Sequence, residues 1–345
     1  MIKPVPQTNL TNAKNYFKSH LTSGDYYSSK QATPGTWMGK GAELLGLNGE
    51  VHEKEFIHLC AGEKPDGSML TQRMNTVREG DTPNRRVFYD WMIAPPKSVS
   101  VAALVGGDDR ILKAHAKAVA IAAKELEKYA TARVRAKGDS MNGKDRATGN
   151  LTMAAFTHET SRAVSAEQVG DPQLHTHLLV FNCTQDPGEN DKWKALQNYE
   201  MLKNQRFISS VYDYELCREL KKMGYAIRSK GKGWELDHIP TSLCDKFSKR
   251  HSKIEETTAE LEASGAKSGH EKLKNRVAHS TRMRKTGSQE AEELRESWQA
   301  QMTASELEAL KSFGKTNEPV RSESPKETVA WTKKHLFERN AVVTQ

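Results

Sequence analysis

Two histidines separated by one residue stand at the start of an apolar stretch. His175 and His177 lie in the run Asp171-Pro-Gln-Leu-His-Thr-His177, which continues as Leu178-Leu-Val-Phe-Asn182. Side chains alternate between the two faces of a β-strand, so these imidazoles point to the same side. His158 ends an earlier strand-like run and can supply a third imidazole if the two strands are neighbours. Three neutral imidazoles suit a divalent transition ion and leave coordination positions open for substrate oxygens.

The simplest alternative is that these are unrelated surface or core histidines, because histidine commonly occupies half-buried positions. The third histidine and the flanking Asp171-Pro172 favour the metal site. A three-histidine ion by itself indicates a hydrolase whose metal activates water.

Tyrosines near the N-terminus suggest a different reaction. Tyr16 lies on an expected helix, and Tyr26 and Tyr27 follow just past its end. A phenol that attacks a phosphodiester forms an aryl phosphodiester and releases a 3′ hydroxyl that can later reverse the step, which is transfer rather than hydrolysis. A tyrosine with a pKa of about 10 needs a base or a nearby cation to act as a nucleophile. The alternative is that these aromatic side chains belong to the core.

The elements that must position these residues follow from periodicity and breakers. Helices are expected over Thr8 to Leu21, Asp109 to Ala136, and from an N-cap at Asn198 to Met223, with Gly224 after its end. Strands are expected over Arg86 to Ala94, Asn150 to His158 and Leu174 to Asn182, and a hairpin over Tyr225 to Leu236. Gly35 to Gly49 is expected to form a glycine-rich loop.

After Pro240 the composition shifts to charged helices with few aromatic residues. Breaks are expected at Ala263 to Gly269 and at Phe313 to Pro325, and capping boxes at Thr303–Glu306 and Ser324–Glu327 predict that helices restart there. We therefore expect a core over residues 1–240, an accessory helical layer over 241–312, a linker over 313–325 and a further helical segment over 326–345.

The composition permits these readings and excludes others. The 345 residues carry a net charge of +8, which favours polyanions such as nucleic acid. A mean hydropathy of -0.74 and the lack of a long apolar run argue against membrane insertion, so we expect a cytoplasmic protein. The four cysteines are scattered, which predicts reduced thiols rather than a disulfide framework or a thiolate zinc site.

Several short motifs follow one another along the chain. They are Asn15-Tyr16-Phe17, Asp25-Tyr26-Tyr27, Trp37-x-Gly39-Lys40-Gly41-Ala42-Glu43, Ala94-Pro-Pro-Lys-Ser98-Val-Ser100, His158-Glu-Thr-Ser-Arg162 and Asp171-Pro-Gln-Leu-His-Thr-His177. Taken in this order, they resemble the motifs of the conjugative relaxases of the MobF class. The resemblance covers about residues 9 to 240, with a further similarity at Leu294-Arg-Glu-Ser-Trp298.

The resemblance implies an α+β fold of the HUH endonuclease type, with a central antiparallel five-stranded sheet and a C-terminal helical segment, residues 241–312 of the same domain, that closes over single-stranded DNA. It also implies that residues 326–345 begin a further domain. It implies that Tyr16 nicks a plasmid transfer origin and forms a 5′-phosphotyrosyl adduct, and that Tyr26 performs the later strand transfer, with Tyr27 as the alternative. His158, His175 and His177 would hold one divalent ion (Mg, Mn or Zn). Asp90 would orient a metal histidine or accept the tyrosine proton.

This sequence departs from the family pattern at two places. Phe17 stands where close relatives often have a second tyrosine, which points to Tyr16 as the nucleophile. The connection between His158 and His175 is a few residues longer than in those relatives.

No Walker A motif is found, because Asp145 replaces the required Ser or Thr in the similar run Gly138 to Asp145.

Partners are implied by the same resemblance. They are single-stranded and hairpin DNA at the transfer origin, relaxosome accessory proteins and the coupling protein of a type IV secretion system, and the protein would be a monomer that a bacterial donor cell delivers with the DNA strand. Phosphate pairing and base stacking would hold the strand, with Trp37 as an additional stacking candidate. The DNA-binding candidates are Arg73, Arg78, Arg85, Arg86, Lys97, Arg162 and Trp193.

Three other functions stay open at this stage. A non-catalytic origin-binding module would use the metal structurally, and a water-activating metallonuclease would leave no protein on the DNA. A rolling-circle replication initiator of the same superfamily would use the same chemistry at another origin.

Overall fold

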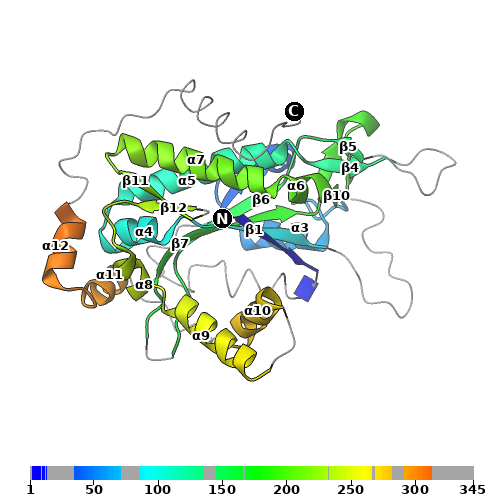
Figure 1. The fold of residues 1–345 in the computed structure, drawn as a ribbon. Coiled ribbons are helices and arrows are strands. Elements are labelled where there is room, and N and C mark those ends of the chain that lie inside the picture. The colour runs from blue at the N-terminus through cyan, green and yellow to red at the C-terminus, as the bar shows by residue number, and fades with distance from the viewer. Residues whose placement is uncertain are drawn as a thin grey trace, which may run out of the picture.

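A five-stranded antiparallel sheet runs through the centre of the computed structural model (Figure 1). The structure describes residues 2–8, 10–11, 13, 35–70, 86–134, 145–165, 168–231, 233–265, 269–281 and 291–312. The strands lie in the order β1 (Ile2–Gln7), β3 (Phe88–Ile93), β7 (Pro172–Phe181), β6 (Met153–Thr160) and β2 (Thr36–Met38). The predicted α+β fold with a five-stranded antiparallel sheet is confirmed.

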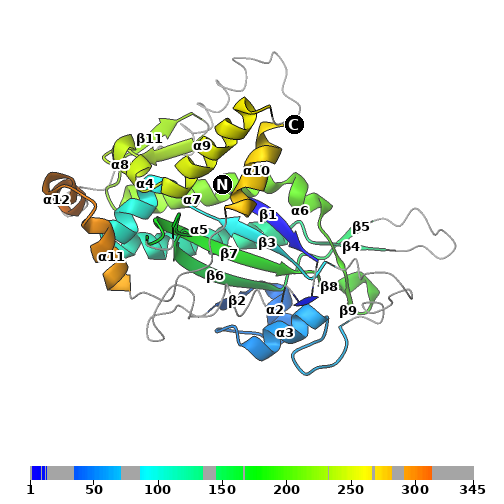
Figure 2. The same cartoon turned by 90° about the horizontal axis from the view of Figure 1, so that it is seen from below.

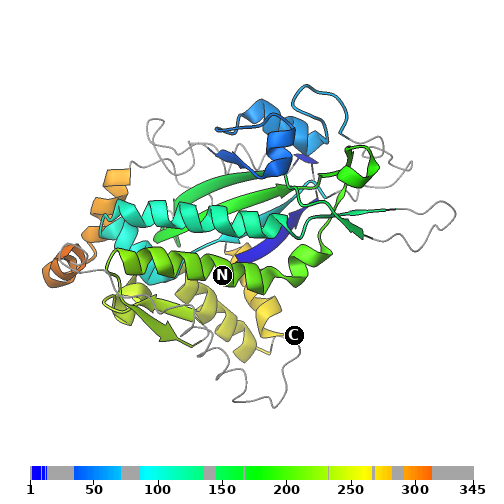
Figure 3. The same ribbon diagram turned by 90° about the horizontal axis from the view of Figure 1, so that it is seen from above.

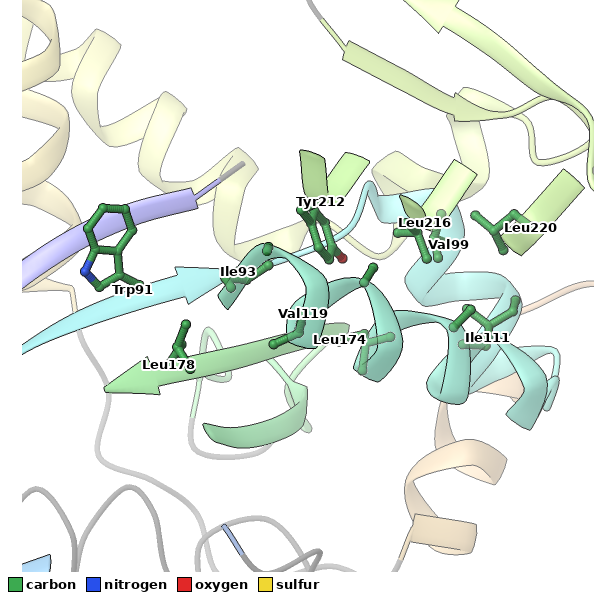
Figure 4. Packing of buried hydrophobic residues seen from close by; sticks show 14 of the residues in the cluster. Trp91, Ile93, Val99, Ile111, Val119, Leu174, Leu178, Tyr212, Leu216 and Leu220 are labelled. Carbon is green, nitrogen blue, oxygen red and sulfur yellow. The ribbon is translucent and has the colours of Figure 1, made fainter. Parts of the chain in front are cut away.

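Two long helices cover one face of the sheet. They are α5 (Asp109–Glu127) and α7 (Gln205–Lys222), which cross in front of the strands when seen from above (Figure 3). Ile93 of β3 and Leu174 of β7 belong to one apolar cluster with Val119 of α5 and Leu216 of α7 (Figure 4). Burial of this apolar surface is the main force that holds the helices to the sheet.

The helices α2 (Lys40–Leu44) and α3 (Glu53–Ala61) pack against the opposite face at one end of the sheet. Phe56 of α3 packs edge-on against Phe181 of β7, with ring centroids 5.4 Å apart. Figure 2 shows the strands with α2 and α3 on one side and α9 (Lys249–Ala263) and α10 (His270–Ser280) on the other. This arrangement leaves the start of β7 and the end of β6 away from α2 and α3.

Smaller elements connect these layers. A short helix α4 (Lys97–Ser100) continues into a π-helical turn η3 (Val101–Val105), α6 (Tyr199–Lys203) precedes α7, and η4 (Pro187–Glu189) is a 3-10 turn. The small sheets comprise β4 (Thr131–Arg133), β5 (Asp145–Ala147) and β10 (Leu196–Gln197), then β8 (Thr184–Asp186) with β9 (Lys192–Lys194), and the hairpin β11 (Ile227–Lys230) with β12 (Gly233–Leu236).

The C-terminal described segment is helical and contributes to the main core. After α8 (Thr241–Lys246), α9 and α10 come α11 (Ala291–Gln299) and α12 (Ala304–Ser312). Leu294, Trp298 and Leu310 belong to the same apolar cluster as the long helices. Thr303 and Glu306 form the predicted capping box, because Thr303 Oγ1 accepts from the Glu306 amide at 3.2 Å and Glu306 Oε2 accepts from the Thr303 amide at 2.8 Å.

Four details differ from the sequence expectations. The sequence did not indicate strand β1. Pro4 and Pro6 have no backbone N–H to donate to a neighbouring strand. The sheet accommodates them because β1 is an edge strand, in which alternate backbone groups have no partner strand. The loop expected from Gly35 to Gly49 contains β2 and α2. The long helix ends at Glu127 rather than Ala136, because the following residues pair as β4 with β5 and β10.

The fourth difference concerns the helix expected from Asn198 to Met223. It is divided at Asn204 into α6 and α7, and the Asn198 side chain makes no capping hydrogen bond. Gly224 follows the end of α7 with φ of 94°, as a glycine after a helix end commonly does. The predicted hairpin and the break between Ala263 and Gly269 are confirmed. The capping box at Ser324, the linker over 313–325 and the segment 326–345 lie outside the described residues.

Candidate metal centre

Three imidazoles meet where β6 and β7 pair. His158 of β6 stands directly opposite His175 of β7, and His177 follows two residues later on the same face. The ring centroids are 5.2 to 5.3 Å apart, and one nitrogen from each ring lies within 4.8 Å of the others. The prediction that the three histidines come together on one face is confirmed, and they form the metal-ligand cluster found among the described residues.

Hydrogen bonds orient two of the rings. His177 Nδ1 lies 2.9 and 2.8 Å from the two carboxylate oxygens of Asp90, and His175 Nδ1 lies 2.9 Å from the Gln173 carbonyl oxygen. A carboxylate and a carbonyl only accept, so Nδ1 of each ring carries the proton and Nε2 keeps its lone pair. This is the common arrangement of a metal-binding histidine, in which the outer hydrogen bond fixes the tautomer and the ring direction.

Burial keeps His175 neutral. His158 and His175 are each 9% exposed, and desolvation lowers the pKa of His175 to about 4, with a further contribution from the nearby His177. A neutral imidazole is the form that binds metal ions, so His175 is ready to bind near neutral pH without losing a proton. The donor set, its spacing and its protonation fit a divalent transition ion.

A second polar chain supports the strand from behind. Thr176 points away from the histidine face, where its hydroxyl contacts His115 Nε2 of α5 and Thr157 Oγ1 of β6, both at 2.8 Å. His115 Nδ1 contacts the Tyr212 hydroxyl of α7 at 2.7 Å. Burial lowers the pKa of His115 to about 3. This chain ties both long helices to the residue between the two histidines of β7; sequence reasoning missed it, because His115 lies in a helix without any motif.

The other predicted site residues fall into two groups. Tyr16, Tyr26, Tyr27, Arg73, Arg78 and Arg85 lie outside the described residues. Asp90 lies at the metal centre, whereas Arg86 is exposed before β3, with Nη1 3.4 Å from the Tyr89 hydroxyl. Arg162 is partly buried just after β6, close in sequence to His158.

Lys97 has internal partners rather than a free charge. Its Nζ donates to the Pro172 carbonyl oxygen at 3.0 Å. Burial lowers the pKa of Lys97 to about 8, opposed by the charges of Asp171 and Glu235. An ammonium group that already donates to an interior carbonyl has one donor fewer to offer a phosphate. This geometry does not favour the predicted DNA contact.

The two tryptophans lie away from the histidines. Trp37 is 6% exposed, and its indole N–H donates to Glu55 at 3.1 Å, so the expectation that it stacks on bases is wrong for this conformation. Trp193 is partly buried in β9 and packs against the cluster around Phe181. Trp193 comes after the C-terminal end of β7, whereas His175 lies near the N-terminal end of that strand.

Comparisons with known proteins agree with this geometry. The family model for the TrwC relaxase matches residues 10–305. The multifunctional conjugation protein TraI of Escherichia coli is 36% identical over 260 residues, which is 70% of this chain and 14% of that protein, and TraI of strain K12 is also 36% identical. The chain thus spans about one seventh of the length of the curated relatives it matches.

Solved structures of the relaxase TrwC are similar over nearly their whole length. The copper-bound complex of TrwC with oriT DNA is 36% identical, with a TM-score of 0.73, over 89% of this chain and 98% of that one. A TrwC complex with a 27-mer DNA comprising the recognition hairpin and the cleavage site is 35% identical, with a TM-score of 0.71, over 89% of this chain and 98% of that one. With a family model that covers most of its length and structural likeness at this identity, the chain belongs to the TrwC relaxase family.

Proposed function

We propose that this protein is a conjugative relaxase that nicks one strand of a plasmid transfer origin by tyrosine transesterification. The observation that carries the proposal is the histidine cluster, with His177 oriented by Asp90, on the central sheet of a fold that is similar to a relaxase bound to its origin DNA. A single divalent ion held by His158, His175 and His177 would polarise the oxygens of the scissile phosphate.

The reaction is a balanced exchange of phosphoester bonds. The phenol oxygen of Tyr16 attacks phosphorus, a bond to that oxygen forms, and the bond from phosphorus to the 3′ oxygen breaks. The phenol loses its proton, and the leaving 3′ oxygen takes up a proton to become a hydroxyl. The 5′-phosphotyrosyl ester stays available for attack by a 3′ hydroxyl, which re-forms the phosphodiester and releases the Tyr16 phenol. A second cleavage by Tyr26, or by Tyr27, would free the 3′ hydroxyl that makes this attack.

The described residues contribute orientation and charge state. Both carboxylate oxygens of Asp90 accept from the Nδ1–H of His177. This supports an orienting role for Asp90 over the alternative, in which Asp90 accepts the tyrosine proton. The Gln173 carbonyl orients His175, and burial keeps that ring neutral. Hydrogen bonds from within the fold thus set the directions of both rings, which is the kind of preorganisation that favours a charged transition state.

A denaturing gel tests the proposal. The protein is mixed with a single-stranded origin oligonucleotide and Mg²⁺ or Mn²⁺, and we expect a band of protein covalently joined to DNA. Tyr16→Phe should give no such band, whereas Tyr26→Phe and Tyr27→Phe should still give it. Persistence of the band in Tyr16→Phe would remove Tyr16 from its role.

The same assay separates the alternatives. Tight binding without cleavage identifies an origin-binding module, and cleavage without an adduct identifies a water-activating nuclease. An adduct formed on a replication origin but not on a transfer origin identifies a replication initiator.

Other parts of the proposal concern organisation and setting. We infer that residues 1–240 form the catalytic core and that 241–312 belong to the same domain and close over the DNA. The core contacts of Leu294 and Trp298 support the single domain. Relaxosome accessory proteins, a coupling protein of a type IV secretion system and a cytoplasmic setting in a bacterial donor are part of the same proposal, as is a monomeric state. Among the described residues no helix is both long and apolar enough to span a bilayer.

A further inference from the structure

Hydrogen bonds join the residue after β6 to the residue before β7, the strand that carries His175 and His177 and is called the histidine strand below. The Ser161 amide donates to the Asp171 carbonyl oxygen at 2.8 Å, and the Asp171 amide donates to Ser161 Oγ at 3.1 Å. A Cβ added to Gly170 would lie 1.9 Å from the Ser161 carbonyl oxygen, so only glycine permits this approach. The position of residues 170 and 171 relative to β6 is therefore closely defined.

Two helices of the C-terminal segment form hydrogen bonds with residues 170 and 171. The Lys249 amide at the start of α9 donates to Asp171 Oδ2 at 2.8 Å, and Lys249 Nζ lies 3.6 Å from Oδ1. Ser248, the residue before α9, makes no capping bond with its side chain, so Asp171 supplies the cap from a distant segment. Trp298 of α11 donates its indole N–H to the Gly170 carbonyl oxygen at 2.9 Å.

Two further residues of β7, Pro172 and Leu174, are also held by hydrogen bonds. Lys97 Nζ donates to the Pro172 carbonyl oxygen at 3.0 Å, and Ser100 Oγ accepts from the Leu174 amide at 3.1 Å. His175 follows directly, opposite His158. Asp171 itself is 4% exposed, and a buried carboxylate in contact with a helix N-terminus and a lysine is a strong local constraint.

We propose that Asp171 is a positioning residue through which α9 sets the histidine strand, with α11 acting on the neighbouring residue Gly170. The segment proposed to close over DNA and the proposed metal centre are then energetically linked through residues 170 and 171. Linkage is reciprocal, so an ion bound to the histidines should stabilise the docking of α9, and docking of α9 should strengthen ion binding. The part of this inference that concerns ion binding rests on the proposed function, whereas the part that concerns the contacts of Asp171 does not.

The test uses the whole chain without DNA. Asp171→Asn keeps the shape but removes the charge, and Trp298→Phe keeps an aromatic ring but removes the indole donor. Asp186→Asn is the matched control, because Asp186 is also buried and accepts from Arg146 at 3.0 Å and Lys194 at 2.8 Å, but it lies in β8 beyond the other end of β7. The readouts are Co²⁺ affinity by calorimetry and visible absorption, and amide hydrogen exchange.

We expect Asp171→Asn to raise the Kd for Co²⁺ about tenfold, as loss of an outer support of a metal site does. Trp298→Phe should act in the same direction, and Asp186→Asn should stay within about twofold of the wild type. Exchange of residues 172–177 should be faster in the first two variants only. Added Co²⁺ should slow exchange in α9 of the wild type and not in Asp171→Asn.

An unchanged Kd for Co²⁺ in Asp171→Asn, or an equal loss in Asp186→Asn, overturns the positioning role. A wild-type chain that binds no Co²⁺ contradicts the proposed metal centre instead. Amide hydrogen exchange without metal then still tests the positioning role of Asp171. Faster exchange of residues 172–177 in Asp171→Asn and not in Asp186→Asn supports that role. Identical exchange in the two variants overturns it.

Discussion

Both carboxylate oxygens of Asp90 lie within 2.9 Å of Nδ1 of His177, across the antiparallel pair β3–β7. Asp90 stands opposite Leu179 in the ladder, so His177 is its diagonal neighbour on the same face. Such diagonal neighbours are within reach of longer side chains. The contact joins the metal-ligand strand to the strand beside it.

Loss of this carboxylate should weaken metal binding. Asp90→Asn removes the charge that favours the Nδ1–H tautomer of His177, so we expect affinity for Mn²⁺ or Co²⁺ to fall by about tenfold or more. Isothermal titration calorimetry measures it. Asp108→Asn is a suitable control, because Asp108 is hydrogen-bonded to Tyr225 at the start of α5, and its replacement should leave metal affinity unchanged. Equal affinities in all three proteins would contradict the orienting role.

Acid should destabilise the fold through His115. Its pKa is lowered to about 3 by burial, whereas the unfolded chain binds that proton near pH 6.5. Between these values the unfolded state binds more protons, so the free energy of unfolding falls as the pH falls, by about 1.4 kcal/mol per pH unit for each such group.

Urea unfolding between pH 6.5 and 4.5 tests this effect. His115→Gln removes one titrating group, so the slope of the unfolding free energy against pH should decrease by up to one proton, whatever the absolute stability of the variant. The same slope in both proteins would show that His115 is not the group that takes up the proton on unfolding.

Lys97 and Arg86 should differ in their effect on DNA binding. Lys97 faces the Pro172 carbonyl and interior carboxylates, whereas Arg86 is exposed. Each phosphate contact to single-stranded DNA adds about 0.7 to the slope of log affinity against log salt. We expect Arg86→Met to reduce this slope and Lys97→Met to leave it unchanged, as measured by fluorescence anisotropy with an origin oligonucleotide. A smaller slope in Lys97→Met would restore Lys97 as a phosphate contact.

Gly41 should be intolerant of a side chain. A Cβ there would lie 2.6 Å from the Leu151 carbonyl carbon, at the point where the Gly41 amide donates to the Leu151 oxygen at 2.9 Å. Overpacking of this kind costs about 1–3 kcal/mol, so Gly41→Ala should lower the melting temperature by several degrees. Gly269→Ala is the control: open space surrounds Gly269 and its φ lies outside the left-handed region, so this replacement should cost about 0.5 kcal/mol or less. Equal effects of the two replacements would argue against the close packing.

The shared face of the three histidines could be predicted because it depends on residue type and a period of two. His175 and His177 needed only a strand, and His158 needed only that the next strand be its neighbour. Their role as ligands stays a prediction. The Gln173 carbonyl could not be predicted, because every residue has a carbonyl and its direction depends on the finished backbone.

Tertiary contacts explain the errors in the elements. Residues after Glu127 have good helix formers among them, yet β4 forms because β5 and β10 offer partners that a local pattern cannot reveal. The glycines at 39 and 41 were read as a loop. In the structure they allow close packing of α2 against the Leu151 backbone, with the Lys40 and Leu151 amides both donating to buried Glu127.

The prolines of β1 have a consequence for how copies of this chain meet each other. An open sheet edge normally offers N–H groups to which a strand of a second molecule can add, and this is a common route to aggregation. Pro4 and Pro6 have no such hydrogen atoms to offer, and β1 forms one border of the central sheet. The border nearest the N-terminus therefore resists elongation by another strand, which protects the protein at high concentration and during refolding.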